Sequence, residues 1–284
     1  MRIIKRKKGN KEYYYLQHSF RKGKKVITKE KYIGLQIPKN INKIKGEFSR
    51  ELKFDLYKKL EKIKKHFQNE WKRIPKSAQE KEKQEISIAF TYNSNAIEGS
   101  TITLHEAREI IQDKIAPNRP LRDIKETEMH SKVFLNMLKN KEKITNKLLL
   151  KWHKEIFGET KLDIAGKYRN YLVRVGPYVA PHWKEIKPVM NQIIEFVNKS
   201  ELNPVELAAR AHYKFESIHP FGDGNGRIGR LLANHILWHA GYPMLIIEYK
   251  KRASYYKAFP KGQEAFADYF LKRYLAIHKN RLKK

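Results

Sequence analysis

The stretch that decides the fold reads HPFGDGNGRIGR and runs from His219 to Arg230. Its closely spaced glycines let the main chain turn sharply and approach a ligand without clashes from Cβ atoms. A histidine stands at its start, an aspartate lies within it, and Arg227 and Arg230 stand three residues apart at its end. This combination predicts a cradle for nucleotide phosphates that carries its own base and a metal ligand.

Helices are predicted on both sides of this stretch. Asn203 is a good N-cap before Pro204, which suits the first helical position, and apolar residues then recur on one face until Pro220. After the stretch, apolar residues again recur at helical spacing until Gly241 and Pro243. The glycine-rich loop therefore ends on a helix N-terminus, where free N–H groups and the helix dipole favour phosphate.

The stretch resembles the signature of Fic-domain proteins, HPFxDGNGRxxR, and matches it at every fixed position. The resemblance covers roughly residues 85–260 and implies a mainly α fold, a Fic-type helical bundle with a β-hairpin flap. It implies a nucleotidyltransferase that moves AMP from ATP onto a Ser, Thr or Tyr hydroxyl of a protein, itself included. His219 is then the general base and Asp223 the ligand of Mg²⁺. The residues expected to hold the phosphates are Gly224, Asn225, Gly226, Arg227 and Arg230.

A second segment, residues 94–99, closes a helix that is predicted to begin near Ala78. Gly99 is the natural residue after the helix end, and the Glu98 carboxylate faces the negative end of the helix dipole unless a cation partners it. The segment resembles the inhibitory motif (S/T)xxxE(G/N) of the Fic family, with Ser94 on the face of Glu98. The resemblance implies that Glu98 pairs with Arg230 and fills the space of the ATP γ-phosphate. The alternative is an exposed helix-end glutamate.

Residues 161–183 break the helical pattern and predict a β-hairpin. By resemblance this hairpin is the flap that receives the target segment, because an exposed strand edge can bind an extended peptide through main-chain hydrogen bonds. A plain surface hairpin is the alternative. The flap residues expected to dock the target are Arg174, Val175, Gly176, Pro177, Tyr178 and Val179.

Tyr255 and Tyr256 stand where the family places a tyrosine pair at the adenine pocket. Adjacent helical residues face different ways, so only one of the two is expected to touch the base. A tyrosine pair in the core is the alternative. His235 and His239, four residues apart, could bind zinc, but they lie on an apolar stripe without a third ligand, and this favours packing.

Residues 1–46 predict a small basic β unit of two or three strands, followed by an N-terminal helical region at 47–140 and a catalytic core at 141–284. The run Tyr13, Tyr14 and Tyr15 lies between basic clusters, so this unit could stack bases and hold phosphates. A hairpin whose tyrosines pack a modest core is favoured, because such interleaving carries no base code. One amphipathic helix is predicted from Glu47 to about Trp71, and a capping box at Thr103 predicts another.

The composition limits the partners and the cellular location that the sequence allows. The 284 residues carry a formal net charge of +31, which attracts nucleic acids, nucleotides and other anions unless it belongs to a solvated lysine-rich surface. There is no cysteine, no apolar run long enough to span a bilayer and no secretion signal, so a cytoplasmic protein without a membrane partner is expected. Three other functions stay open: removal of AMP by the same site, transfer of another nucleotide or phospho group, and nucleic-acid binding with the Fic core as an appendage. A homodimer is also left open.

Overall fold

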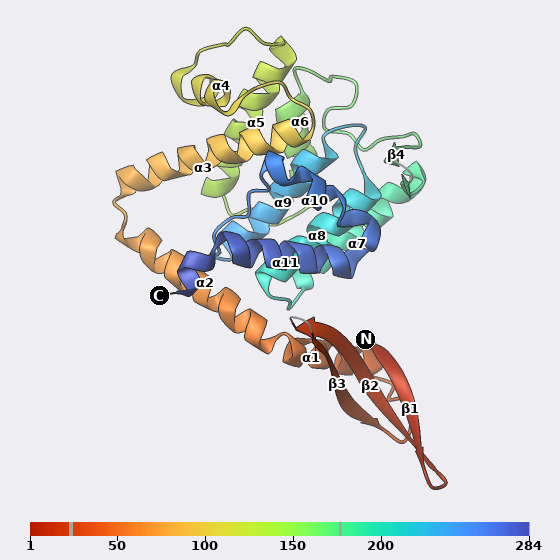
Figure 1. Ribbon diagram of the computed structural model, residues 1–284. Coiled ribbons are helices and arrows are strands. Elements are labelled where there is room, and N and C mark those ends of the chain that lie inside the picture. The colour runs from red at the N-terminus through yellow and green to blue at the C-terminus, as the bar shows by residue number, and fades with distance from the viewer. Residues whose placement is uncertain (23–24, 176–177, 284) are drawn as a thin grey trace. The chain divides into compact units, whose positions relative to one another are not determined.

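The computed structural model describes residues 1–22, 25–175 and 178–283. Contacts within it divide the chain into two compact units, Met1–Lys59 and Leu60–Lys284. The mainly α architecture with a small N-terminal β unit is confirmed (Figure 1). The finer division at residues 46 and 140 stays a prediction.

The first unit is a three-stranded antiparallel sheet with one helix. The strands are β1 (Arg2–Lys8), β2 (Lys11–Lys22) and β3 (Lys25–Gly34), in that order across the sheet. Side chains alternate between the two faces of a sheet. Leu16 and Ile33 therefore share one face, where they pack against Phe48 of helix α1 (Ile41–Leu52). A modest core is present, but of the three tyrosines that were expected to form it only Tyr14 packs against it.

One long helix was expected from Glu47, but the structure has two, and the prediction was wrong. Helix α1 ends at Leu52 and α2 (Phe54–Arg73) begins two residues later. Lys53 leaves helical geometry with φ −97° and ψ 3°, and its N–H group is shared between the carbonyls of Ser49 and Arg50. The apolar spacing continues through this break, so periodicity alone could not reveal it.

The second unit is mainly helical, and its longest connection runs from the end of α6 at Phe157 to the hairpin that begins at Arg174. Its longer helices after α2 are α3 (Lys76–Ile97), α5 (Leu121–Lys139), α6 (Asn146–Phe157), α7 (Ile186–Lys199), α8 (Pro204–Ile218), α9 (Asn225–His239) and α11 (Gln263–Ile277). The short elements are α4 (Leu104–Arg108), β4 (Arg174–Val175), β5 (Tyr178–Val179) and α10 (Arg252–Tyr256). Single turns of other helix types lie at Glu109–Asp113, Trp183–Glu185, Tyr249–Lys251, Phe259–Lys261 and Lys279–Leu282.

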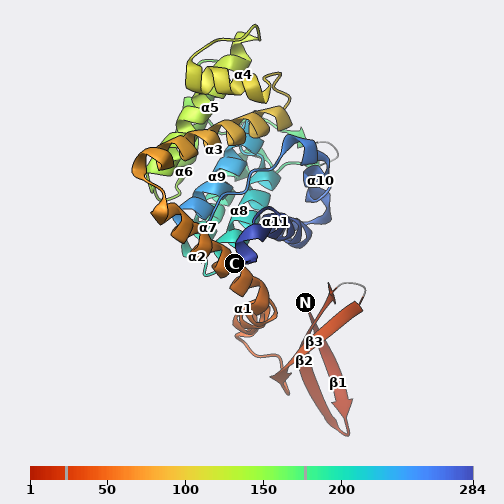
Figure 2. The same ribbon diagram turned by 60° about the vertical axis from the view of Figure 1, so that its left-hand side comes forward.

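Helix α9 is the centre of this unit. It contacts α3, α5, α6 and α8, and Figures 1 and 2 show it among the other helices of the unit. Its residues from Asn225 to Leu237 are buried. Its C-terminal turn is anchored by side chains that donate to main-chain carbonyls: His235 to Glu142 and His239 to Met137. The two histidines are therefore structural, and among the described residues no group of three or more metal-ligating side chains is placed to hold an ion.

The helix ends follow the capping residues in the sequence. Gly99 has φ +90°, and the Ser100 N–H donates to the Asn95 carbonyl, so α3 ends in the expected glycine motif. Thr103 and Glu106 form both bonds of the predicted capping box. The helix they open passes into a π turn and ends at Lys114, which has φ +60°. No helix within the described ranges is long and apolar enough to cross a membrane.

Candidate active site

His219 ends helix α8 in a left-handed conformation. Its φ is +51°, which is strained for a residue with a Cβ atom and persists only when the surroundings enforce it. A buried arginine, Arg169, provides that support: its Nε donates to the His219 carbonyl at 2.8 Å and its Nη2 donates to the Pro181 carbonyl at 2.7 Å. Arg169 therefore links the backbone at His219, the predicted base, to the backbone at Pro181, which follows the flap.

The imidazole of His219 is mostly buried. Burial lowers its pKa, while the main-chain carbonyl of Glu216 raises it, and the net shift is downward. Its Nδ1 lies 4.0 Å from the Glu216 carboxylate. Since Nδ1 faces this acid inside the protein, Nε2 is the nitrogen that can meet an incoming hydroxyl. A neutral imidazole at pH 7 suits a general base.

The loop is closed by side chains, not only by glycines. The Asn225 amide accepts from the Phe221 N–H at 2.8 Å and donates to the Phe221 carbonyl at 2.9 Å. Phe221 is fully buried and stacks on His153 with ring centroids 3.9 Å apart. His153 accepts from the Gly166 N–H, so its other nitrogen donates to the Asp223 carbonyl. Burial lowers the pKa of His153 to about 4. Sequence reasoning missed this histidine.

A network of alternating charges surrounds Asp223, the predicted metal ligand. Lys161 Nζ lies 2.8 Å from both Asp223 and Glu126, and Glu126 also pairs with Arg227. Burial raises the pKa values of Asp223 and Glu126, but these cations outweigh it and hold both pKa values below the ordinary range. Phe157 lies beneath both cations, 4.7 Å from Lys161 and 4.3 Å from Arg227. Glu126 lies 101 residues before Arg227 in the sequence and Lys161 lies 62 residues before Asp223, and no local signal marked either residue.

Arg230 and Glu98 are in contact. Arg230 Nη2 donates to the Glu98 carboxylate at 2.7 Å, and the guanidinium also donates to the hydroxyl and the carbonyl of Ser94, each at 2.9 Å. Burial lowers the pKa of Arg230, but Glu98, Tyr255 and Glu216 together outweigh it and the net shift is upward. The end of α3 is thus held against the first turns of α9 by a charged, partly buried bond.

Glu98 lies directly over the N-terminus of α9. A Cβ atom added to Gly226 would lie 2.1 Å from a Glu98 carboxylate oxygen and 2.9 Å from Arg230. The absence of a side chain at Gly226 therefore leaves a space that the carboxylate occupies. This space lies beside the first-turn N–H groups of α9, where an anion is favoured.

Gly224 gives a prediction about stability. It has φ +76°, and an added Cβ atom would lie 2.4 Å from the Phe157 ring. We expect Gly224→Ala to lower the free energy of unfolding by about 2 to 4 kcal/mol, through backbone strain and overpacking. Gly99→Ala is the matched control: it has φ +90° but open space around it, so it should cost only about 1 kcal/mol. Chemical denaturation measures both, and equal losses would contradict the contact with Phe157.

The predicted flap is a short hairpin, and its four described docking residues are exposed. Arg174 pairs with Val179 and Val175 with Tyr178 in antiparallel register, while Gly176 and Pro177 lie outside the described residues. The Tyr178 hydroxyl donates to the Ser217 carbonyl at 2.9 Å, which ties the hairpin to the last turn of α8.

The two candidate adenine tyrosines face different surroundings. Tyr255 is buried and its hydroxyl lies 2.7 Å from His212. Tyr256 is 47% exposed, and its hydroxyl donates to the Ile97 carbonyl at 3.1 Å, on the last turn of the helix that carries Glu98. Of the pair, Tyr256 is therefore the one that can meet a ligand.

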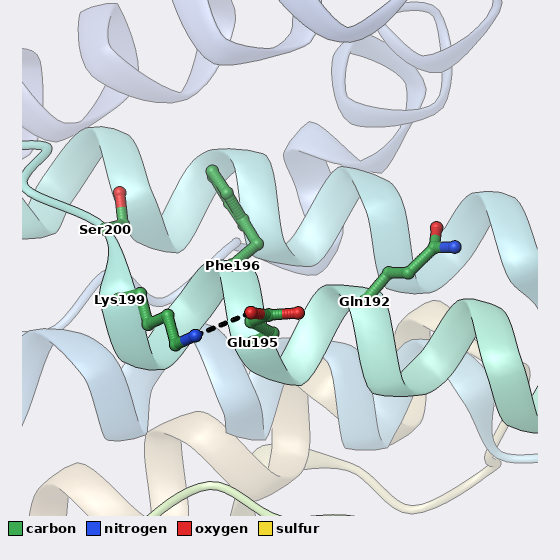
Figure 3. Close-up of a pocket in the computed structure, with 5 residues that line it drawn as sticks. All are labelled: Gln192, Glu195, Phe196, Lys199 and Ser200. Carbon is green, nitrogen blue, oxygen red and sulfur yellow. Dashed lines mark hydrogen bonds and ion pairs between the residues drawn. The ribbon is translucent and has the colours of Figure 1, made fainter.

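A shallow hollow lies elsewhere, on helix α7 and the residue after it (Figure 3). It is lined by Gln192, Glu195, Phe196, Lys199 and Ser200. Lys199 donates to Glu195 at 2.7 Å, so its one carboxylate is already paired. None of the predicted site residues that the structure describes lines this hollow.

Comparison with known proteins fits this geometry. Residues 143–237, which include the loop, match the model of the Fic/DOC family. This segment of the chain is therefore similar to a Fic domain. A solved structure that resembles the chain is Fic-1 from C. elegans, 25% identical with a TM-score of 0.68, covering 86% of this chain and 77% of that one. A Fic domain containing signaling protein from Bacteroides thetaiotaomicron, 23% identical with a TM-score of 0.67, covers 78% of this chain and 96% of its own, which supports the fold.

Curated relatives of the Fic domain are named Protein adenylyltransferase Fic. The relative from Nematostella vectensis is 37% identical over 181 residues, which cover 61% of this chain and 42% of the relative. The relative from Drosophila willistoni is 36% identical over 192 residues, which cover 63% of this chain and 38% of the relative. The chain thus spans about two fifths of the length of the curated relatives that it matches.

Proposed function

We propose that this chain is a protein adenylyltransferase that transfers AMP from ATP to a protein hydroxyl. The observation that carries this proposal is the convergence of a base, an acid and two arginines on one buried helix N-terminus, with an exposed strand edge fixed to the same main chain. The names of the curated relatives support it.

The residues divide the reaction between them. His219 takes the proton of the target hydroxyl, because its imidazole is neutral and its Nε2 faces outward. The first-turn N–H groups of α9 hold the α- and β-phosphates, and Arg227 and Arg230 donate to the β- and γ-phosphates. Tyr256 meets the adenine. A target segment that pairs with the flap brings its hydroxyl to a fixed depth beside His219.

The residues at Asp223 fit a Mg²⁺ ion. This carboxylate is half exposed and already contacts a cation, the Lys161 ammonium. Mg²⁺ prefers one or two carboxylates together with phosphate oxygens, so a single aspartate is enough on the protein side. When bound, the ion supplies charge stabilisation to the phosphates as pyrophosphate leaves.

We further propose that the site is autoinhibited. Glu98 fills the space beside Gly226 and holds Arg230, so the γ-phosphate cannot reach its arginine while the carboxylate is in place. An acid at this position could instead orient a water molecule and remove AMP from a modified protein, which is the alternative reaction of the same site.

The test is transfer of radioactive label from ATP to protein with Mg²⁺ present. Label on the α-phosphate should become bound to the chain itself, whereas label on the γ-phosphate should not. Retention of γ-label alone would mean phosphoryl transfer and would refute AMP transfer. Incubation of a previously AMP-modified chain without ATP measures removal: release of AMP would favour the alternative.

A second candidate function belongs to the N-terminal sheet, which we propose binds single-stranded nucleic acid. Residues 1–34 hold twelve Lys or Arg residues and two Glu residues. On the sheet face opposite the core, Tyr15 and Tyr32 lie with ring centroids 5.3 Å apart, Tyr13 lies 6.1 Å from Tyr32, and Arg6 lies over Tyr15. Clustered aromatic rings on a basic face can stack bases while the cations hold phosphates.

We expect the full chain to bind a fluorescent single-stranded oligonucleotide with an affinity that falls steeply with salt. The double variant Tyr15→Ala, Tyr32→Ala removes stacking without changing charge and should weaken binding by at least about tenfold. Lys250→Ala, Lys251→Ala, which removes two charges from the other unit, is the control. Salt-insensitive binding, or equal losses in both double variants, would contradict a stacking face on the sheet.

A further inference from the structure

Glu216 is a buried acid that the proposed transfer does not use. It lies on the last turn of α8, and its Oε1 is buried without a hydrogen-bond partner. Burial and the nearby Glu98 charge raise its pKa to about 8, although Arg230 lowers it. At neutral pH with Glu98 in place, Glu216 is therefore mostly protonated and neutral.

Glu216 and Arg230 belong to the same buried group of charges. One nitrogen of Arg230, Nη1, is also buried without a partner, and a Cβ atom added to Gly229 would lie 2.7 Å from Glu216 Oε1. Each group shifts the pKa of the other in the direction that favours its charged form. The titratable or charged side chains that act on this group are Glu98 from the end of α3, His212 and His219 from α8, Arg230 from α9, and Tyr255 and Tyr256 from α10.

The two histidines of this group carry no charge at neutral pH. Burial lowers the pKa of His212 to about 3 and also lowers the pKa of His219, so both are neutral at pH 7. Burial raises the pKa of Tyr255 well above its ordinary value, so its hydroxyl keeps its proton. If Glu98 leaves, Glu216 is the remaining acid in this group that can become an anion beside the buried Arg230.

We propose that Glu216 is the alternative counter-ion of Arg230, neutral while Glu98 is bound and ionised when Glu98 leaves. The Glu216 carboxyl then releases its proton to solvent, and the buried guanidinium keeps one negative partner. When the nucleotide places its γ-phosphate on Arg230, Glu216 takes a proton back from solvent. The net charge around Arg230 thus stays close to constant when Glu98 leaves and when the nucleotide binds. This inference rests on the proposed function of the site.

The consequence is that nucleotide binding by the released site takes up a proton. The experiment is calorimetric titration of the full-length Glu98→Gly variant with Mg²⁺ and an ATP analogue whose α–β bridge cannot be cleaved, in buffers of different ionisation enthalpy at pH 7, where a carboxyl with a pKa of about 8 is mostly protonated. We expect Glu98→Gly to take up close to one more proton per nucleotide than Glu98→Gly, Glu216→Gln. Between pH 6 and 9, affinity should fall about tenfold more in the single variant than in the double variant.

The control is Glu98→Gly, Glu206→Gln, which removes another buried acid of α8 that already pairs with Arg210. It should take up as many protons as Glu98→Gly. Equal proton uptake with and without Glu216 would overturn the proposal. Because binding is measured without transfer, a variant that binds the analogue but transfers no AMP would refute the proposed function and leave this test intact.

A second measurement needs no nucleotide. A carboxyl whose pKa is higher in the folded than in the unfolded chain stabilises the fold at low pH, and this stability is lost as pH rises towards the folded pKa. The melting temperature of the wild type should therefore fall more between pH 5 and 8 than that of Glu216→Gln. In the Glu98→Gly background the difference should be smaller, because the anion that raises the pKa of Glu216 is gone. An unchanged difference would also overturn the proposal.

Discussion

Replacing Glu98 with glycine should raise the rate of AMP transfer to the chain by about 10- to 100-fold. The bond between Glu98 and Arg230 is charge-assisted and partly buried, and such bonds contribute about 1.5 to 3 kcal/mol. A nucleotide that must displace this bond binds productively less often by the corresponding factor. The measurement is label from the α-phosphate of ATP incorporated per minute, with nucleotide affinity determined in parallel.

Two further variants make this test specific. Glu98→Gln keeps the size of the side chain but loses its charge, so its rate should lie between those of the wild type and Glu98→Gly. Glu82→Gly places a glycine at an exposed position of α3 and controls for loosening of this helix. Its transfer rate should stay at the wild-type level, because the bond between Glu98 and Arg230 is intact. Equal labelling by Glu98→Gly and the wild type, both shown to be folded, would refute autoinhibition.

Replacing His219 with alanine should lower AMP transfer by about 10²- to 10⁴-fold, the range contributed by a positioned general base. Nucleotide affinity should change little, because the phosphates are assigned to the turns that follow. The test is best done in the Glu98→Gly background, where the starting rate is high. His105→Ala removes an exposed histidine and is the matched control. Full transfer by His219→Ala would refute the assignment of the base.

The pH dependence of kcat, measured at saturating nucleotide so that changes in affinity do not enter, gives an independent check on the same residue. The base works when neutral, so the rate should rise with pH through the pKa of His219 and then level off. Burial holds this pKa below its ordinary value, and the rise should therefore be complete near neutral pH. Glu98 raises the pKa of His219, so its removal should move the rise to lower pH. A rise centred above pH 7 would contradict a buried neutral imidazole.

The features predicted correctly from the sequence were those with a local cause. Asn203 accepts from the N–H groups of Val205 and Leu207, Gly99 ends its own helix, and Thr103 forms a capping box with Glu106. In each case the residues that contact one another are close in the sequence, so their spacing predicts the contact. The contact between Glu98 and Arg230 spans 132 residues and was expected only from the resemblance to a family.

The residues that were missed depend on tertiary contacts. Arg169 meets His219 across 50 residues, and Glu126 meets Arg227 across 101. A single arginine in a loop or a single glutamate on a helix is ordinarily solvated, so neither type of residue indicates burial. The role of the Asn225 side chain was also missed: the prediction concerned only its main-chain N–H group, and the side-chain amide closes the loop on Phe221.

Arg169 has a consequence for how targets are chosen. The same guanidinium donates to His219 and to Pro181, so the base and the chain after the flap are positioned from one common reference point. In the proposed transfer, a peptide that pairs with the flap is therefore positioned relative to His219, and the distance from the strand edge to the reacting hydroxyl is set by this chain and not by the target. The length of the target side chain then decides specificity: a residue is modified when its side chain is long enough to bring its hydroxyl across this fixed distance to His219.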